Sequence, residues 1–219
     1  MDKMTLFHHR DVAIPCPDGQ KIRGRLDLPP DALGLVIFAH GSGSGRHSPR
    51  NQFIAREWQQ VGLATLLIDL LTEEESANRA NVFDIELLAE RLVTAATWAA
   101  GQEETAELPV GYFGASTGAA AALVASARSP RTVSVVVSRG GRPDLAGEYL
   151  PKVQSPTLLI VGGLDSEVLE LNRQAKAGMK AKAKIEIVPG ATHLFEEPGT
   201  LEKAAELAKN WFLEHFSKD

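Results

Sequence analysis

Short apolar runs alternate with longer amphipathic segments along almost the whole chain. Two short segments at 12–15 and 21–28 flank the turn sequence PDGQ and predict a β-hairpin. Two continuous apolar runs, LGLVIFAHG at 33–41 and LATLLIDLL at 63–71, predict strands that are buried on both faces. Further apolar segments bring the expected number of strands to eight, at 108–113, 132–138, 157–162 and 184–188.

Helical periodicity fills the segments between these strands. Apolar residues such as Phe83, Leu87 and Leu92 recur at helical spacing and predict a long helix over 78–101. Other helices are predicted at 48–62, 116–128, 166–178 and 199–216. This alternation is typical of an α/β protein with a mostly parallel sheet and helices on both of its faces. No repeat or linker interrupts the pattern, so the sequence predicts a single domain over residues 1–219.

Composition and charge narrow the class of protein. The net charge of −5 argues against nucleic acid as a partner, because nucleic-acid-binding proteins usually carry a basic excess. No segment resembles a signal peptide or reaches the roughly 20 apolar residues of a membrane span. The single cysteine, Cys16, excludes an intramolecular disulfide. We expect a cytoplasmic protein, a monomer or homodimer, with no membrane or nucleic-acid partner.

The most informative stretch is GYFGASTG, where a predicted strand meets a predicted helix at a serine. In G-x-S-x-G, small neighbours let the chain turn sharply, and the turn presents Ser116 above the edge of the sheet. The N–H of Thr117 then lies at a helix N-terminus, where it can bind a developing negative charge. A glycine-rich helix start in any doubly wound protein is the alternative interpretation of this motif.

A serine nucleophile needs a histidine base and a carboxylate that orients it. Asp165 follows the strand in PTLLIVGGLD, and His193 follows the next strand in IEIVPGATHLF. Carboxyl ends of parallel strands meet at one edge of a sheet, so these residues are expected near Ser116. The glycine-rich loop FAHGSGSGRH offers Ser42 as a second oxyanion donor, whereas a phosphate-binding loop would need a lysine that is missing here. His40 is expected to brace this loop.

The motifs HGSGSG, GYFGASTG, LLIVGGLD and PGATHLF together resemble the dienelactone-hydrolase-like branch of the α/β-hydrolase superfamily. The resemblance implies an eight-stranded α/β-hydrolase fold without a large cap domain, and a cofactor-free serine esterase. It assigns Ser116 as nucleophile, Asp165 as acid and His193 as base, with Ser42 and Thr117 as oxyanion donors. Dienelactone hydrolases proper carry a cysteine as nucleophile, so the serine favours a small carboxylic ester over dienelactone itself. A thioesterase, a peptidase or a non-catalytic binding module are the alternatives.

Several arginines are expected near this edge of the sheet. Arg46 beside the glycine-rich loop and Arg139 after the strand at 132–138 are candidates for binding an anionic substrate with paired hydrogen bonds. The alternative is that the arginines here pair with the chain's own acids, such as Asp69 and Asp144. His8 and His9 are expected to precede the first strand, exposed to solvent and without the companions of a metal site. The segment 139–156 lacks amphipathic helices, which predicts an open and shallow pocket.

Overall fold

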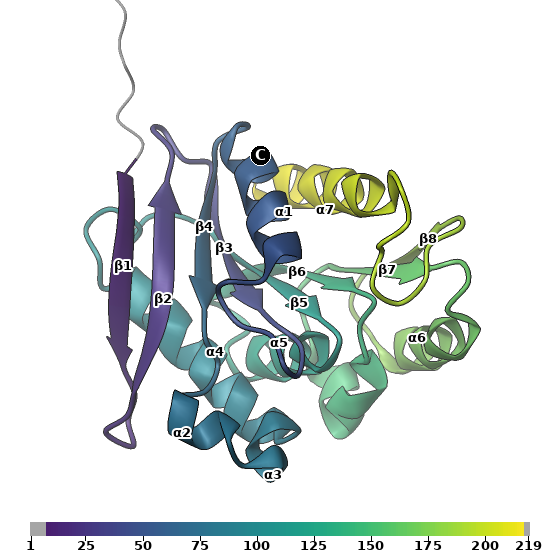
Figure 1. The fold of residues 1–219 in the computed structure, drawn as a ribbon, viewed down its shortest axis with the longest axis horizontal. Helices are drawn as coiled ribbons and strands as arrows, with labels where there is room; N and C mark the ends of the chain where they lie inside the picture. Colours follow the sequence, from purple (N-terminus) through teal and green to yellow (C-terminus); the bar gives the residue numbers. More distant parts are fainter. Residues whose placement is uncertain (1–7, 217–219) are drawn as a thin grey trace, which may run out of the picture.

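A single eight-stranded sheet forms the centre of the protein (Figure 1). The structure is a computed structural model that describes residues 8–216. The strand order is β1-β2-β4-β3-β5-β6-β7-β8, and β3 to β8 are parallel to one another. The strands are β1 (His8–Pro15), β2 (Lys21–Leu28), β3 (Gly34–Ala39), β4 (Leu63–Ile68), β5 (Val110–Ala115), β6 (Val133–Arg139), β7 (Thr157–Gly162) and β8 (Ala183–Val188). The predicted α/β-hydrolase architecture is confirmed.

The first two strands form the predicted antiparallel hairpin, and β2 also pairs antiparallel with β4. The prediction that His8 and His9 precede the first strand is wrong, because both lie within β1 opposite Leu28 and Asp27. Their expected exposure is confirmed. The ring of His9 contacts the carboxylate of Asp27 across the hairpin. The strand therefore begins earlier than the apolar segment at 12–15 predicted, because His9 pairs with Asp27, 18 residues away in the sequence.

Helices cover both faces of the sheet, as predicted (Figure 1). On one face, α1 (Pro49–Gln59) and α7 (Thr200–Phe216) pack over an aromatic cluster that includes Trp58, Phe113 and Phe212. On the other face, α4 (Ile85–Ala100) and α5 (Thr117–Arg128) pack against each other, and α6 (Ser166–Gly178) packs on β7 and β8. Ten of the twelve residues of α5 are buried, which explains its alanine-rich sequence, because small side chains let it approach the sheet and α4 closely.

The segment predicted as one helix over 78–101 is interrupted. A short helix α3 (Arg79–Val82) ends at Phe83, and α4 starts after Asp84, whose carboxylate accepts the backbone N–H of Leu87 at 3.1 Å. Before α3, the acidic residues 73–75 form most of a further short helix, α2 (Glu73–Ser76), closed by a reciprocal capping interaction between Thr72 and Glu75. Capping side chains thus decide both boundaries.

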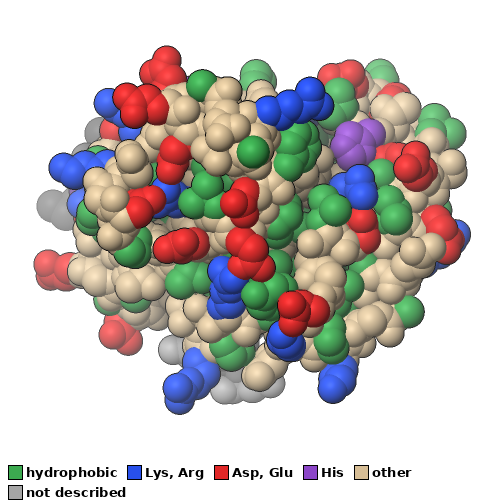
Figure 2. All heavy atoms as spheres, turned by 90° about the horizontal axis from the view of Figure 1, so that it is seen from below, with side chains coloured by type: hydrophobic (Ala, Val, Ile, Leu, Met, Phe, Trp, Pro, Cys, Tyr) green, Lys and Arg blue, Asp and Glu red, His purple; other side chains and the backbone are tan. Residues whose placement is uncertain are grey.

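Within the described residues, no large cap covers the carboxyl edge of the parallel strands. The connection after β6 contains only the 3₁₀ helix η1 (Pro143–Lys152), which packs beside α5 and α6. Across the part of the chain from 8 to 216, no helix is long and apolar enough to cross a bilayer. The face shown in Figure 2 carries acidic and basic side chains interspersed with hydrophobic ones, rather than an expanse of one charge. Because η1 is the only helix described after β6 and before β7, the loops at the carboxyl ends of β3 to β8 remain accessible for a site.

Candidate active site

Ser116 occupies a strained turn between β5 and α5. Its backbone angles are φ 52° and ψ −125°, and only Asp31 and Phe195 share a positive φ among the non-glycine residues described. Such a conformation costs roughly 1–3 kcal/mol and persists only when the surroundings enforce it. A Cβ added at Gly114 would lie 2.4 Å from the Cα of Ala119, and one at Gly118 would lie 2.2 Å from the carbonyl oxygen of Ala39. The small residues predicted around the serine are therefore required for this turn.

The structure brings Asp165 and His193 together. Asp165 follows β7 at the start of α6, and His193 lies in the loop between β8 and α7. The Nδ1 of His193 is 2.7 Å from the Oδ2 of Asp165, a short hydrogen bond in which the ring N–H donates. The histidine side chain is 39% exposed and the aspartate 15% exposed. The pair thus leaves the opposite ring nitrogen, Nε2, available for another partner.

The loop after β6 connects the histidine to the serine turn. The backbone N–H of Arg142 donates to the carbonyl of Ser116 at 3.1 Å. In the same loop, a Cβ added at Gly140 would lie 2.9 Å from the carbonyl oxygen of His193 and 3.8 Å from its Nδ1. Gly140 has a φ of +51°, so a side chain there would be both strained and crowded. One loop therefore contacts both residues, a contact that sequence reasoning missed although the Gly140-Gly141 pair pointed to a close approach.

The glycine-rich loop after β3 packs directly against Ser116. A Cβ at Gly41 would lie 2.9 Å from the Cβ and 3.7 Å from the Oγ of Ser116. Ser42, the next residue, is exposed. Thr117, which follows Ser116 in the chain, is the first residue of α5, so its backbone N–H has no acceptor within the helix. Both predicted donor residues therefore flank the serine.

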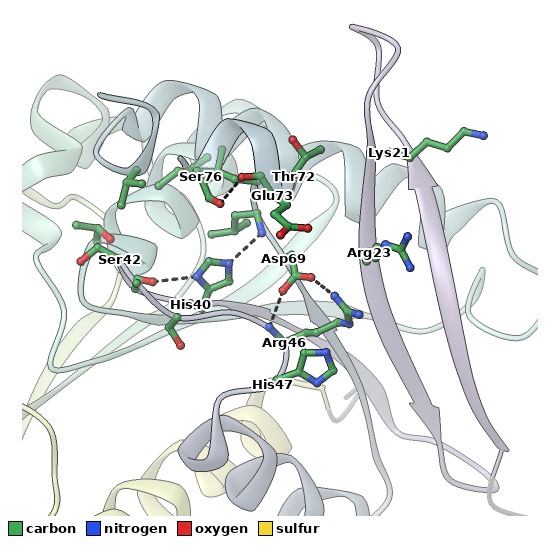
Figure 3. A pocket seen from close by; sticks show the side chains of 18 residues that line it. Lys21, Arg23, His40, Ser42, Arg46, His47, Asp69, Thr72, Glu73 and Ser76 are labelled. Atoms are coloured by element: carbon green, nitrogen blue, oxygen red, sulfur yellow. Dashed lines mark hydrogen bonds and ion pairs between the residues drawn. The ribbon is translucent and has the colours of Figure 1, made fainter. Parts of the chain in front are cut away.

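His40 braces this loop, as expected. Its Nδ1 donates to the carbonyl of Gly41 at 2.9 Å, and its Nε2 accepts the backbone N–H of Leu70 at 3.0 Å (Figure 3). An Nε2 that accepts an N–H must be unprotonated, which assigns the proton to Nδ1. Burial lowers the pKa of His40, so the ring is held in its neutral form. The imidazole thus links the loop after β3 to the loop after β4.

Arg46 is held by Asp69 at the end of the same loop. The backbone N–H of Arg46 donates to Asp69 Oδ1 at 2.8 Å, and its guanidinium contacts Oδ2 (Figure 3). A Cβ at Gly45 would lie 2.7 Å from that carboxylate, so the chain must be glycine where it passes Asp69. Arg142 likewise pairs with Asp144. For these two arginines, pairing with the chain's own acids is confirmed.

A cavity of about 750 Å³ opens beside the serine turn. It lies on the side of the glycine-rich loop, and its lining includes Gly41, Ser42 and Thr117 but not Ser116, Asp165 or His193. Figure 3 shows Arg46 and His47 on one side of it and Lys21 and Arg23 on the strand β2. The segment from Leu70 to Val82 supplies a second wall of this cavity, and the shallow pocket expected at the serine stays a prediction.

Arg139 stands at the end of β6, as predicted, but not on an exposed rim. The residue is only 8% exposed, and its guanidinium lies over the ring of Phe113 at 5.7 Å from the ring centre. Burial, together with the nearby charge of Arg50, lowers the pKa of Arg139 to about 10. Its register on the sheet turns it toward the face covered by α1, along with Val135 and Val137.

The remaining candidate groups lie elsewhere. Cys16, in the hairpin, is buried and its thiol faces the carbonyl of Ile14. Among residues 8–216, no three histidine, cysteine or acidic side chains are grouped so that they could hold a metal ion.

Known proteins similar to this chain fall into two groups. The sequence model of the dienelactone hydrolase family matches residues 23–218. A dienelactone hydrolase from Anabaena variabilis ATCC 29413 is 52% identical, with a TM-score of 0.92 over 95% of this chain and 98% of that one. Est1E from Butyrivibrio proteoclasticus, at 18% identity and a TM-score of 0.80 over 95% and 99% of the two chains, shares the fold.

Two proteins from Mycobacterium tuberculosis strains CDC 1551 / Oshkosh and ATCC 25618 / H37Rv are 60% identical over 204 residues, which is 93% of this chain. They bear the provisional name phosphoribosyl transferase. This chain spans only 45% of their length.

Proposed function

This chain belongs to the dienelactone hydrolase family, and we propose that it hydrolyses small carboxylic esters through an acyl-enzyme on Ser116. The observation that carries the proposal is the hydrogen bond of 2.7 Å between His193 and Asp165, formed at the same sheet edge as the strained turn of Ser116. A structural histidine would need neither an acidic partner at Nδ1 nor a free Nε2. A serine that served only to start a helix would need no positive φ.

In the proposed reaction, Ser116 Oγ attacks the ester carbonyl and His193 Nε2 takes its proton. Asp165 keeps the proton on Nδ1 and stabilises the imidazolium that forms. The carbonyl oxygen becomes an oxyanion, which receives hydrogen bonds from the backbone N–H groups of Thr117 and Ser42. His193 then protonates the leaving alcohol, and the same residues activate water to release the acid.

The strained turn and the glycine-rich loop support this assignment of the oxyanion donors. Gly41 packs against the Cβ of Ser116, so the backbone of the loop approaches the serine as closely as a side-chain-free residue allows. His40 and Asp69 hold the loop from behind, through Gly41 and Arg46. Donors fixed in advance cost no reorganisation when the charge develops.

The cavity beside Ser116 is the proposed binding site for one side of the ester. Its lining combines hydroxyls, three cationic side chains and the acidic Asp69 and Glu73 with several aliphatic side chains, which favours a small, polar substrate over a long acyl chain. Arg46 is part of that wall and is held in place by Asp69, so it is our candidate for contact with the substrate there.

The name of the Mycobacterium tuberculosis relatives describes proteins about twice as long as this chain. We assign the hydrolase to this chain because the family match at 23–218 covers nearly all of it. Thioester or peptide hydrolysis on the same three residues, and a binding role without catalysis, are the competing functions.

Ser116→Ala tests the proposal. Labelling by a fluorophosphonate probe should disappear, and kcat for p-nitrophenyl esters should fall by a factor of about 1,000 or more. Ser129→Ala, at the other end of α5, is the matched control and should change neither. A Ser116→Ala protein that keeps more than about a tenth of the wild-type kcat would refute the role of the serine.

A substrate panel separates the competing functions. The proposal expects p-nitrophenyl esters with short acyl groups to be hydrolysed faster than acyl-coenzyme A thioesters or peptide anilides of the same acyl group. A higher kcat/KM for either of the other two would assign that class instead. Absence of both labelling and turnover in the wild type would leave the binding role.

A further inference from the structure

The guanidinium of Arg139 is a buried charge with one donor that no residue between 8 and 216 accepts. Its Nη1 atom is inaccessible to solvent and has no hydrogen-bond partner among the described residues. The ring of Phe113 covers one face of the guanidinium but supplies no acceptor in the plane where its N–H groups point. Buried charges in proteins are normally paired, because desolvation is costly. The lowered pKa of Arg139 has the same cause.

A second arginine adds to the positive charge. Arg50, in the first turn of α1, adds a like charge that contributes, after burial, to the lowered pKa of Arg139. Its guanidinium also binds Glu196 at 2.9 Å, with the two side chains 37% and 62% exposed. Arg139, Arg50 and Glu196 together carry one net positive charge. This cluster therefore has the charge to accept an anion, and Arg50 lies on its solvent side.

The cluster adjoins the proposed catalytic residues on two sides. Arg139 is the strand partner of Ala115, the residue before Ser116. Glu196 lies three residues after His193 in the same loop, and Gly140, next to Arg139, contacts the backbone of His193. An anion held here would lie beside the residues of the ester site. It would be on the face of the sheet covered by α1.

We propose that Arg139 and Arg50 form a subsite for an oxyanion group, carboxylate or phosphate, next to Ser116. Two guanidinium groups can bind the oxygen atoms of such a group with charge-assisted hydrogen bonds. The anion belongs either to the substrate or to a free ligand that occupies the subsite. This inference rests on the proposed ester hydrolysis for its substrate form, whereas anion binding itself does not depend on catalysis.

The test uses pairs of esters that differ only in charge. Mono-p-nitrophenyl esters of succinic, glutaric and adipic acid carry a free carboxylate, and their methyl esters do not. For the chain length that fits, Arg139→Met and Arg50→Gln should each raise KM for the anionic ester at least tenfold and change KM for the neutral one less than twofold. Arg139→Lys, which keeps the charge, should recover part of the loss. Arg56→Gln, on the same helix as Arg50, should leave both esters unaffected.

A second arm identifies a free anion as the ligand. Inorganic phosphate, at constant ionic strength, should then change the hydrolysis of a neutral ester by the wild type, and Arg50→Gln should abolish this effect. Equal losses on charged and neutral esters would overturn the subsite and leave Arg139 a structural residue. The subsite would also be overturned if the wild type showed no preference for the anionic ester at any of the three chain lengths and phosphate had no effect on hydrolysis of the neutral ester.

Two cases need a further measurement: that in which the substitution unfolds Arg139→Met, and that in which the wild type hydrolyses none of the esters. If Arg139→Met does not fold, the KM values of Arg50→Gln, which alters a partly exposed side chain, decide the test. Should the wild type hydrolyse none of the esters, the proposed function fails, and thermal unfolding then tests the subsite separately. Phosphate or glutarate should raise the melting temperature of the wild type and of Ser116→Ala, but not of Arg50→Gln. No rise in either protein would overturn the inference.

Discussion

Gly41→Ala measures how closely the glycine-rich loop is packed on Ser116, the proposed nucleophile. A Cβ at residue 41 would lie 2.9 Å from the Cβ of Ser116 and 3.2 Å from the carbonyl oxygen of Ala115. Carbon atoms pack best at about 3.5–4.0 Å, so the loop or the turn must move by roughly 0.5–1 Å. A misplacement of about 1 Å can cost about 100-fold in rate. We expect kcat to fall by about 10- to 100-fold.

The fold itself should tolerate the change. Overpacking costs roughly 1–3 kcal/mol, and the reduced freedom of the unfolded chain when glycine is replaced offsets about 0.4–1 kcal/mol of this. Gly24→Ala is the control, because its Cβ would lie 3.1 Å from side-chain atoms of both Val12 and Ile68, away from the serine. It should lose comparable stability and keep kcat within about twofold.

The assay is kcat and KM for p-nitrophenyl acetate together with urea unfolding of the same preparations. The loss in Gly41→Ala should appear in kcat, since the oxyanion is bound only in the transition state. The reasoning fails if Gly41→Ala keeps more than half of the wild-type kcat. It also fails if Gly24→Ala loses as much activity as Gly41→Ala does.

Two further predictions concern stability. Burial lowers the pKa of His40, so the unfolded chain binds a proton at this residue more readily than the folded chain, and the free energy of unfolding should decrease as pH falls below about 6.5. The free energy of unfolding of His40→Gln should depend less on pH between pH 6.5 and 5. An identical pH dependence in the variant and the wild type would contradict this role of His40. Arg91, whose side chain is 1% exposed, binds Asp18 at 2.6 Å and Glu75 at 2.5 Å, so it ties the hairpin turn to α2. Arg91→Met should lower the free energy of unfolding, measured by urea titration, by about 2 kcal/mol. The control Arg131→Met, at an exposed residue, should lower it by no more than about 0.5 kcal/mol. Equal losses in the two variants would show that the ion pairs of Arg91 contribute nothing to stability.

Local patterns were sufficient for most of the fold. The buried strands appear as continuous apolar runs, since burial on both faces admits few polar residues. Ser116, Asp165 and His193 could be proposed as a set because each follows a strand, and parallel strands bring their carboxyl ends to one edge. The break at Phe83 was also present in the sequence, as the capping residues Asn78 and Asp84, but the apolar periodicity continued across it.

Contacts between distant segments could be decided only by the tertiary structure. That Arg46 binds Asp69 depends on β4 lying next to β3 in the sheet, an order that no periodicity reports. The burial of Arg139 depends on segments far from β6 in the sequence, among them α7, which packs on β6, and the loop of His193, which approaches Gly140. Periodicity records which face of an element is buried, because it reflects contacts along one helix or strand. The partner of a charged side chain, and whether it has one, is determined by segments far apart in the sequence that only the folded chain brings together.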